Sequence, residues 1–119
     1  MNNIMFLGNI YPTKTRANPN QGRVYHPDGL SPTLNCSGGG NRQPYVLTND
    51  CGGGRLMIRK YTPRDCLQLM GFDDADVDAL IEAGISDTQL YKLAGNSIVV
   101  DVAECLFCQI FDNNNEIWV

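Results

Sequence analysis

The sequence lacks the features that mark a membrane or secreted protein. No uninterrupted apolar run approaches the roughly 20 residues that a bilayer-spanning helix needs. The first residues, MNNIMFLGNIYP, lack the basic segment and the long apolar core of a signal peptide. We therefore expect a cytoplasmic chain without a membrane partner.

The spacing of the cysteines and of the single histidine does not complete a metal site. The five cysteines are an odd number, which disfavours a disulfide framework. Cys105-x-x-Cys108 has metal or redox spacing, but no second such pair completes the four ligands of a structural zinc. The pair lies inside an apolar helical pattern, which favours buried structural cysteines. The single histidine, His26, has no sequence partner for acid–base chemistry, and we predict that the chain binds no metal.

The charges that are present divide sharply along the chain. Residues 1–64 hold eight basic and two acidic side chains, a net charge of +6. Residues 65–119 hold one basic and eleven acidic side chains, a net charge of −10. Such a division suggests two faces with different functions, because a basic half can contact phosphates. The alternative is that acidic helices simply follow a polar loop region.

The first half has the pattern of short strands that carry long loops. Residues 4–11, 45–48 and 55–59 are short apolar runs that predict strands. Residues 12–44 are rich in Gly, Pro, Asn and Ser, with brief extended pieces at 23–25 and 33–35. We expect an α/β chain, of the α+β kind, that begins with a small antiparallel β lobe.

The second half has the start and stop signals of helices. Thr62 and Asp65 have the spacing of a capping box, Pro63 suits the first helical position, and Gly71 ends the helix. Apolar spacing predicts three further helices, at about 74–83, 86–93 and 97–111, the last of them a packed helix. The chain then divides into a β lobe at 1–60, a helical lobe at 61–111 and a polar tail at 112–119.

Two blocks of the second half, in this order, match two motifs of one enzyme family. Residues 59–72 read RKYTPRDCLQLMGF, and residues 89–100 read QLYKLAGNSIVV. They resemble motifs IX and X of the cytosine-5 DNA methyltransferases, R-x-L-T-P-R-E-C-x-R-L-x-G-F and Q-x-Y-K-x-x-G-N-S-V. The upstream segments NQGRVY, DGLSPTL and SGGG look like the family's target recognition region, whose glycine-rich loops enter the DNA major groove. The resemblance covers about residues 8–111.

The resemblance implies contacts with both S-adenosylmethionine (AdoMet) and double-stranded DNA. Gly95, Asn96 and Ser97, followed by Ile98, match the motif X turn that borders the AdoMet pocket. A Gly-Asn turn that opens a helix would present N–H groups to a polar ligand, although it could also be an ordinary helix cap. Arg23 matches a position that can read guanine through O6 and N7; a phosphate contact or a solvated arginine is the alternative. The residues implied in DNA binding are Gln21, Arg23, Thr33, Ser37, Gly38, Gly39, Gly40 and Arg42.

The family's catalytic segments are absent from the sequence. There is no F-x-G-x-G loop for AdoMet, no Glu-Asn-Val segment, and no Pro-Cys dipeptide to supply the thiolate that attacks C6 of cytosine. We therefore expect no catalytic residue in this chain, and AdoMet binding only with a complementary catalytic half. In motif IX, Gln68 replaces an arginine and Asp73 replaces a proline, which affects packing or DNA contact but not chemistry.

Three hypotheses follow. The chain is the C-terminal half of a split methyltransferase, or a C-terminal piece of a longer one. Alternatively, it is a non-catalytic DNA-binding or regulatory remnant. A half that depends on a partner should expose an apolar face, through which it would bind the catalytic N-terminal half or associate with itself.

Overall fold

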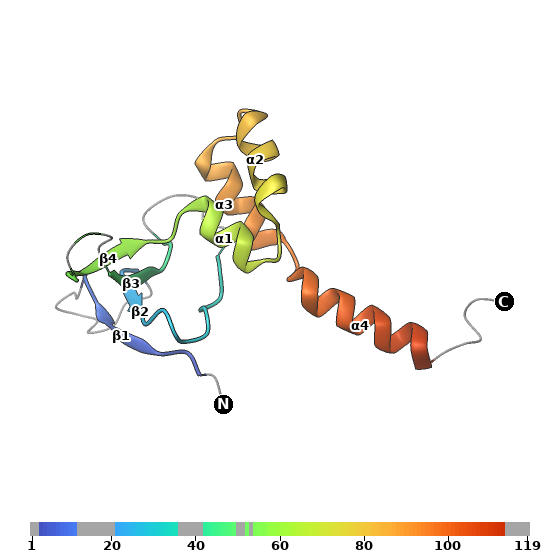
Figure 1. Cartoon of the computed structure of the whole chain (residues 1–119), viewed down its shortest axis with the longest axis horizontal. Helices are drawn as coiled ribbons and strands as arrows, with labels where there is room; N and C mark the ends of the chain where they lie inside the picture. Colours follow the sequence, from blue (N-terminus) through green and yellow to red (C-terminus); the bar gives the residue numbers. More distant parts are fainter. Residues whose placement is uncertain (1–2, 12–20, 36–41, 50–51, 53, 114–119) are drawn as a thin grey trace.

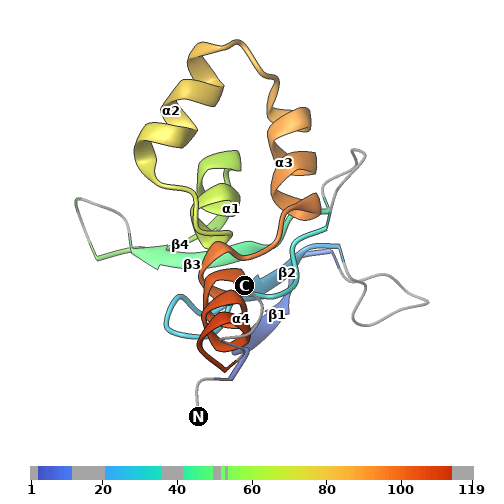
Figure 2. The ribbon, with the colours of Figure 1, turned by 90° about the vertical axis from the view of Figure 1, so that its right-hand side faces the viewer.

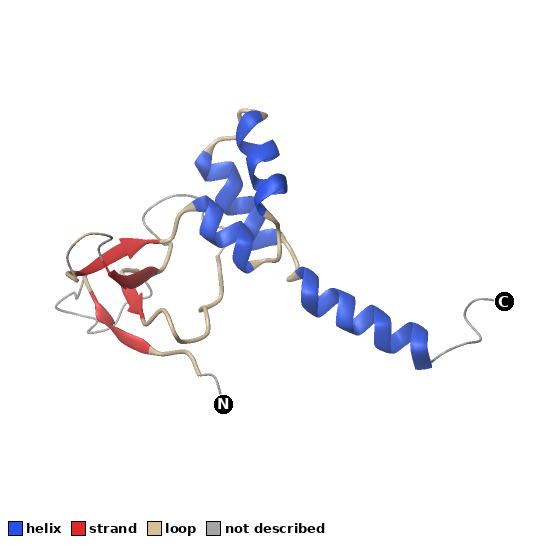
Figure 3. Cartoon of the chain, viewed as in Figure 1, coloured by secondary structure: helices blue, strands red, loops and turns tan. Residues whose placement is uncertain are grey.

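The computed structural model describes residues 3–11, 21–35, 42–49, 52 and 54–113. Within these residues, a small four-stranded sheet comes first along the chain and four helices follow it (Figures 1 and 3). The strands are β1 (Phe6–Asn9), β2 (Arg23–Tyr25), β3 (Tyr45–Asn49) and β4 (Leu56–Lys60). This order confirms the expected α/β class, with a strand lobe before a helical lobe.

The sheet is mixed rather than purely antiparallel. Its strand order is β1-β2-β3-β4, and the β1–β2 and β3–β4 pairs are antiparallel. The central pair is parallel, with Val24 opposite Tyr45 and Tyr25 opposite Val46. The antiparallel prediction was wrong for this pair, because the chain between β2 and β3 is long enough to return to the same end of the sheet. Residues 33–35, expected to be extended, form no strand.

Local sequence signals set the ends of the first two helices. Helix α1 (Pro63–Leu69) begins with the predicted capping box: the Thr62 hydroxyl accepts a hydrogen bond from Asp65 N at 3.1 Å, and the Asp65 carboxylate accepts one from Thr62 N at 2.7 Å. Gly71 follows α1 with φ +92°, where a Cβ would lie 2.9 Å from Val100 Cβ. Helix α2 (Asp74–Glu82) ends just before Gly84, at φ +76°.

The helical lobe has its own small core. Helix α1 packs against α2 and against α3 (Asp87–Asn96), and Figure 2 shows these three helices together on one side of the sheet. Leu67, Val77 and Leu90, one from each helix, are almost completely buried. Cys66 and Ala94 complete the buried cluster. This core holds α1 and α3, the helices that carry the two motif blocks, in fixed relative positions.

Helix α4 (Val100–Asn113) does not pack as predicted. It projects away from the sheet and the other helices, and none of its residues is buried (Figure 1). Leu106 and Phe107 are 55% and 57% exposed. The Cα radius of gyration is 17.7 Å, whereas a compact chain of this length would have about 13.5 Å. The prediction of a helix in this segment is confirmed, but no surface among the described residues covers the apolar side of α4.

By length and composition alone, residues Asp87–Asn113 could cross a membrane. However, α3 ends at Asn96, Ser97 has an extended backbone, and α4 begins at Val100. The 14 residues of α4 rise only about 21 Å, less than the roughly 30 Å of a hydrocarbon core. The absence of a membrane partner therefore stays a prediction.

The core of the helical lobe makes a direct prediction. Leu67 is fully buried, whereas Leu69 on the same helix is 41% exposed. Leu67→Ala should lower the free energy of unfolding by about 2–5 kcal/mol, because it leaves a cavity. Leu69→Ala is the matched control and should change it by no more than about 0.5 kcal/mol. Urea unfolding followed by circular dichroism measures both; equal losses would contradict this description of the core.

Candidate functional site

Three of the residues predicted to bind DNA line one hollow on the strand lobe. Arg23 comes from β2, while Thr33 and Arg42 come from the segments before β3. The hollow has a volume of about 530 Å³. We call it the recognition hollow; its lining residues are Ile4, Phe6, Arg23, Tyr25, Pro32, Thr33, Asn35, Arg42 and Pro44. The structure thus brings together residues that are up to nineteen positions apart in the sequence.

Strand alternation places Arg23 and Tyr25 on the same face of β2. Phe6 of β1 pairs with Tyr25 across the sheet, and their rings meet edge to face at 6.0 Å. The guanidinium carbon of Arg23 lies over the Phe6 ring, 5.9 Å from its centroid. Phe6, Tyr25 and Asn35 had no individually predicted role, although alternation along β2 could have identified Tyr25.

Of the other predicted DNA contacts, only Gln21 belongs to the described residues. Gln21 is exposed in the turn before β2, where its carbonyl accepts a hydrogen bond from Asn9 Nδ2 at 2.8 Å. It does not line the recognition hollow. Ser37, Gly38, Gly39 and Gly40 lie outside the described residues.

The motif X turn borders a second hollow, of about 390 Å³, between the two lobes. Gly95 and Ser97 line it, and so does Thr33, which also lines the recognition hollow. We call this second space the motif X hollow; its lining residues are Ser31, Pro32, Thr33, Leu34, Leu69, Met70, Gly95, Ser97 and Val99. Asn96 and Ile98 are exposed and do not line it. The mixture of hydroxyl and aliphatic groups fits one edge of an amphipathic ligand such as AdoMet.

The local geometry of the motif X turn differs from the expectation. Gly95 and Asn96 are the last residues of α3 and do not open a helix. The N–H of Ser97 donates to Ala94 O at 3.3 Å, and its hydroxyl donates to the same oxygen at 3.0 Å. The prediction that this Gly-Asn pair opens a helix was therefore wrong, because α3 continues through the glycine. The role of these four residues at a cofactor stays a prediction.

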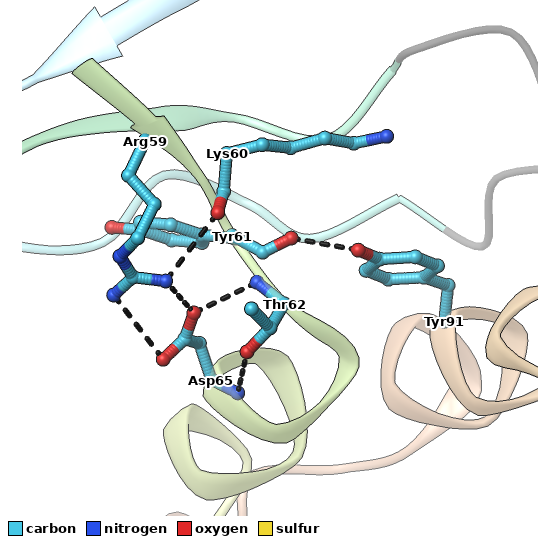
Figure 4. A network of polar contacts seen from close by, with 6 residues as sticks. All are labelled: Arg59, Lys60, Tyr61, Thr62, Asp65 and Tyr91. Atoms are coloured by element: carbon cyan, nitrogen blue, oxygen red, sulfur yellow. Dashed lines mark hydrogen bonds and ion pairs between the residues drawn. The ribbon is translucent and has the colours of Figure 1, made fainter.

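A polar network joins β4 to α1 and α3 (Figure 4). The Arg59 guanidinium forms an ion pair with the Asp65 carboxylate, which also caps α1 through Thr62 N. The Tyr91 hydroxyl of α3 donates to Tyr61 O at 2.7 Å. These contacts connect the last strand directly to the helices that carry motifs IX and X.

Within this network the pKa of Asp65 is lowered and the pKa of Tyr91 is raised. Burial raises the pKa of Asp65, but hydrogen bonds from Arg59 and Thr62 outweigh it and hold this pKa below its usual value. Burial, with the nearby Cys66 and acidic groups, raises the pKa of Tyr91 to about 12. Tyr91 therefore stays protonated at neutral pH and remains a hydrogen-bond donor.

Arginines of the basic half also serve structure. Arg64 pairs with Asp74 and Asp78 of α2, and Gln68 Nε2 donates to Asp74 Oδ1 at 2.7 Å. The replaced positions of motif IX thus have local roles. Asp73, where the family has proline, caps α2 by accepting from Asp76 N at 2.8 Å. The positive charge of residues 1–64 is consequently less available to DNA than the count suggests, since Arg59 and Arg64 contact acids.

The three cysteines among the described residues differ in exposure. Cys66 lies in the core, where burial raises the pKa of its thiol to about 12, so that it stays an unreactive thiol. Cys105 and Cys108 are free and exposed on α4. Their predicted burial was wrong for the same reason as the predicted packing of α4.

Comparison with known proteins identifies the family. The sequence model of the C-5 cytosine-specific DNA methylases matches residues 8–112. The orphan methyltransferase M.SPBetaI of Bacillus phage SPbeta and the putative type II methyltransferase M.BsuMIIP of Bacillus subtilis are each 35% identical over 129 aligned positions, covering 74% of this chain. The orphan methyltransferase M.SPRI of Bacillus phage SPR is 49% identical over 56 residues, 47% of this chain and 13% of that protein. This chain belongs to the C-5 cytosine-specific DNA methylase family.

The match is partial on the relatives' side. The aligned region covers 29% of the length of M.SPBetaI and of M.BsuMIIP. The chain thus spans less than a third of these relatives.

The Asp65 network predicts a specific pH dependence. A carboxyl group whose folded-state pKa is lowered contributes stability above its ordinary pKa, and this contribution is lost as the pH falls through the folded-state value. Asp65→Asn should lower the free energy of unfolding at pH 7 by about 1 kcal/mol. The difference between wild type and variant should shrink as the pH falls below 3.8, the ordinary pKa of the carboxyl group.

Thermal unfolding from pH 7 down to about pH 2.5 measures this difference. Glu104→Gln, on the exposed surface of α4, is the control and should follow the wild type at every pH. A deficit of Asp65→Asn that stays constant across this range would show that the ionised carboxylate is not the source of the stability.

Proposed function

We propose that this chain is the C-terminal part of a cytosine-5 DNA methyltransferase. Its strand lobe contacts double-stranded DNA, and its helical lobe forms one edge of the AdoMet site. The observation that carries the proposal is the convergence of Arg23, Thr33 and Arg42 on one hollow. Thr33 also borders the hollow beside the motif X turn, which brings the DNA side and the cofactor side close together.

The chemistry of the recognition hollow suits DNA. A guanidinium group can bind guanine O6 and N7 in a bidentate manner or form a charge-assisted contact with phosphate. Arg23 and Arg42 supply two such groups, and the Asn35 amide can donate and accept. Helix α2, which carries Asp74, Asp76 and Asp78, belongs to the other lobe, and its carboxylates would repel phosphates. We therefore expect the strand lobe to face the duplex.

The cofactor side follows from the family. AdoMet, when bound, supplies the methyl group. Gly95 and Ser97, which line the motif X hollow, would form one wall of its site, and the exposed Asn96 and Ile98 would flank that wall. The Tyr91–Tyr61 hydrogen bond positions α3, and with it this wall, relative to the strand lobe.

The nucleophile and the main AdoMet loop must come from polypeptide other than these 119 residues. No cysteine here follows a proline, and the thiol of the buried Cys66 stays protonated. We expect this chain alone not to transfer methyl groups. It would act, in the cytoplasm, with a catalytic part that brings the Pro-Cys, F-x-G-x-G and Glu-Asn-Val segments.

The exposed side of α4 is the proposed contact with that catalytic part. Leu106, Phe107, Ile110 and Phe111 are spaced so that they lie along one side of the helix, and the rings of Phe107 and Phe111 stack at 6.1 Å. An apolar helix face of this kind favours burial against a partner. Without the partner, the same face would promote association between copies of the chain.

Methyl transfer tests the proposed function. Labelled AdoMet and duplex DNA are incubated with this chain, with a co-expressed catalytic half from a relative, and with both together. We expect transfer to cytosine only in the mixture, and Arg23→Ala should reduce it by about five-fold or more, because one good bidentate contact contributes about 1–3 kcal/mol. DNA binding without transfer in the mixture would favour the non-catalytic remnant, whereas transfer by this chain alone would refute the assignment of the nucleophile.

The α4 face predicts association at high protein concentration. Sedimentation velocity of the isolated chain should show a concentration-dependent shift to larger species, and Phe107→Glu should abolish it. Gln109→Glu adds the same charge about 200° around the helix and should leave the shift in place. A wild-type chain that stays monomeric throughout would contradict the proposed role of this face.

A further inference from the structure

The aromatic side chain of Phe6 occupies a particular place in the recognition hollow. Phe6 lies on β1 opposite Tyr25 of β2, and both residues line the hollow together with Arg23. Its ring is in contact with two neighbours at once, the edge-to-face Tyr25 ring at 6.0 Å and the Arg23 guanidinium at 5.9 Å. Tyr25 is only 7% exposed, so the Phe6 ring packs against a buried side chain.

We propose that Phe6 is a positioning residue that holds the Arg23 guanidinium in the orientation with which it contacts DNA. The inference rests on the proposed DNA contact of Arg23 and assigns a role to a residue outside the motif blocks. Phe6 itself need not touch DNA, although it is 44% exposed.

The physical reason is the entropy of a long side chain. A free arginine side chain samples many rotamers, and fixing it on binding costs free energy. A guanidinium over an aromatic face, within about 6 Å of the ring centroid, is already restricted before DNA arrives. Since bidentate recognition of a base needs a defined plane for the guanidinium, this restriction favours base reading over a loose phosphate contact.

The pairing of β1 with β2 maintains this arrangement. The β1–β2 register places Phe6 opposite Tyr25, and strand alternation puts Arg23 on the same side as Tyr25. The N–H of His26 donates to Met5 O at 2.9 Å, which extends the pairing beyond Phe6. The position of the ring is therefore set by backbone pairing and by Tyr25.

The experiment measures DNA affinity with the full chain. The wild type first selects duplexes from a pool with a randomised central sequence, and the enriched duplex and an unrelated duplex serve as probes in fluorescence anisotropy. The variants are Phe6→Leu, Phe6→Tyr, Arg23→Ala and the Phe6→Leu/Arg23→Ala double variant. Leu7→Ala, at an exposed apolar residue of β1 that does not line the hollow, is the matched control.

Phe6→Leu should weaken binding to the enriched duplex by about two- to five-fold, the effect of one exposed cation–π contact. Binding to the unrelated duplex and its salt dependence should not change, because the number of charges that meet phosphates is the same. Phe6→Tyr retains the aromatic face and should bind like the wild type. The double variant should be no weaker than Arg23→Ala alone, because Phe6 acts only through Arg23.

Each other result overturns the proposal in a distinguishable way. Wild-type affinity of Phe6→Leu combined with a loss in Arg23→Ala would remove the positioning role and leave the DNA contact intact. The positioning role would also be removed if the double variant lost affinity by the product of the two single-variant losses. The same holds if Phe6→Tyr failed to bind the enriched duplex. An Arg23→Ala variant that binds like the wild type, or a wild-type chain that enriches no sequence, would overturn the proposed DNA contact and the positioning role together.

Discussion

The ion pair of Arg59 with Asp65 sits where the strand lobe meets the helices, and the remaining architecture depends on this junction. Asp65 satisfies two demands at once, since its carboxylate caps α1 through Thr62 N and receives the Arg59 guanidinium from β4. The hydrogen bond from Tyr91 to Tyr61 O ties α3 to the same short segment. Both hollows are consequently held in a fixed relation, and Thr33 lines both of them.

The apolar face of α4 remains exposed, so the helical lobe buries only part of its apolar surface. A core formed by Leu67, Val77 and Leu90 holds α1, α2 and α3 together, but α4 finds no apolar surface among the described residues. The chain spans less than a third of the relatives M.SPBetaI and M.BsuMIIP. The partner surface proposed for α4 would belong to a part of the methyltransferase that these 119 residues do not include. In this arrangement the strand lobe would face DNA while α4 would anchor the chain to the catalytic part.

Several local features could be predicted because they depend on neighbouring residues alone. The capping box of Thr62 and Asp65 and the glycine stops at Gly71 and Gly84 appear where the sequence pattern indicated. The limits of such reasoning are equally local. Gly95 favours an end to α3, yet the helix continues to Asn96, because packing of Leu90 and Ala94 in the core outweighs the small helix penalty of one glycine.

By itself, the sequence determined the family, the order of the two lobes and the start of each early helix, because motif spacing and capping depend on residues close together in the chain. The tertiary structure decided the parallel pairing of β2 with β3, the exposure of α4 and the convergence of Arg23, Thr33 and Arg42. It also placed Phe6 beneath Arg23, a contact between strands that no sequence periodicity encodes. These features arise from contacts between distant segments, whose free energy is fixed only once the sheet register and the helical core have formed.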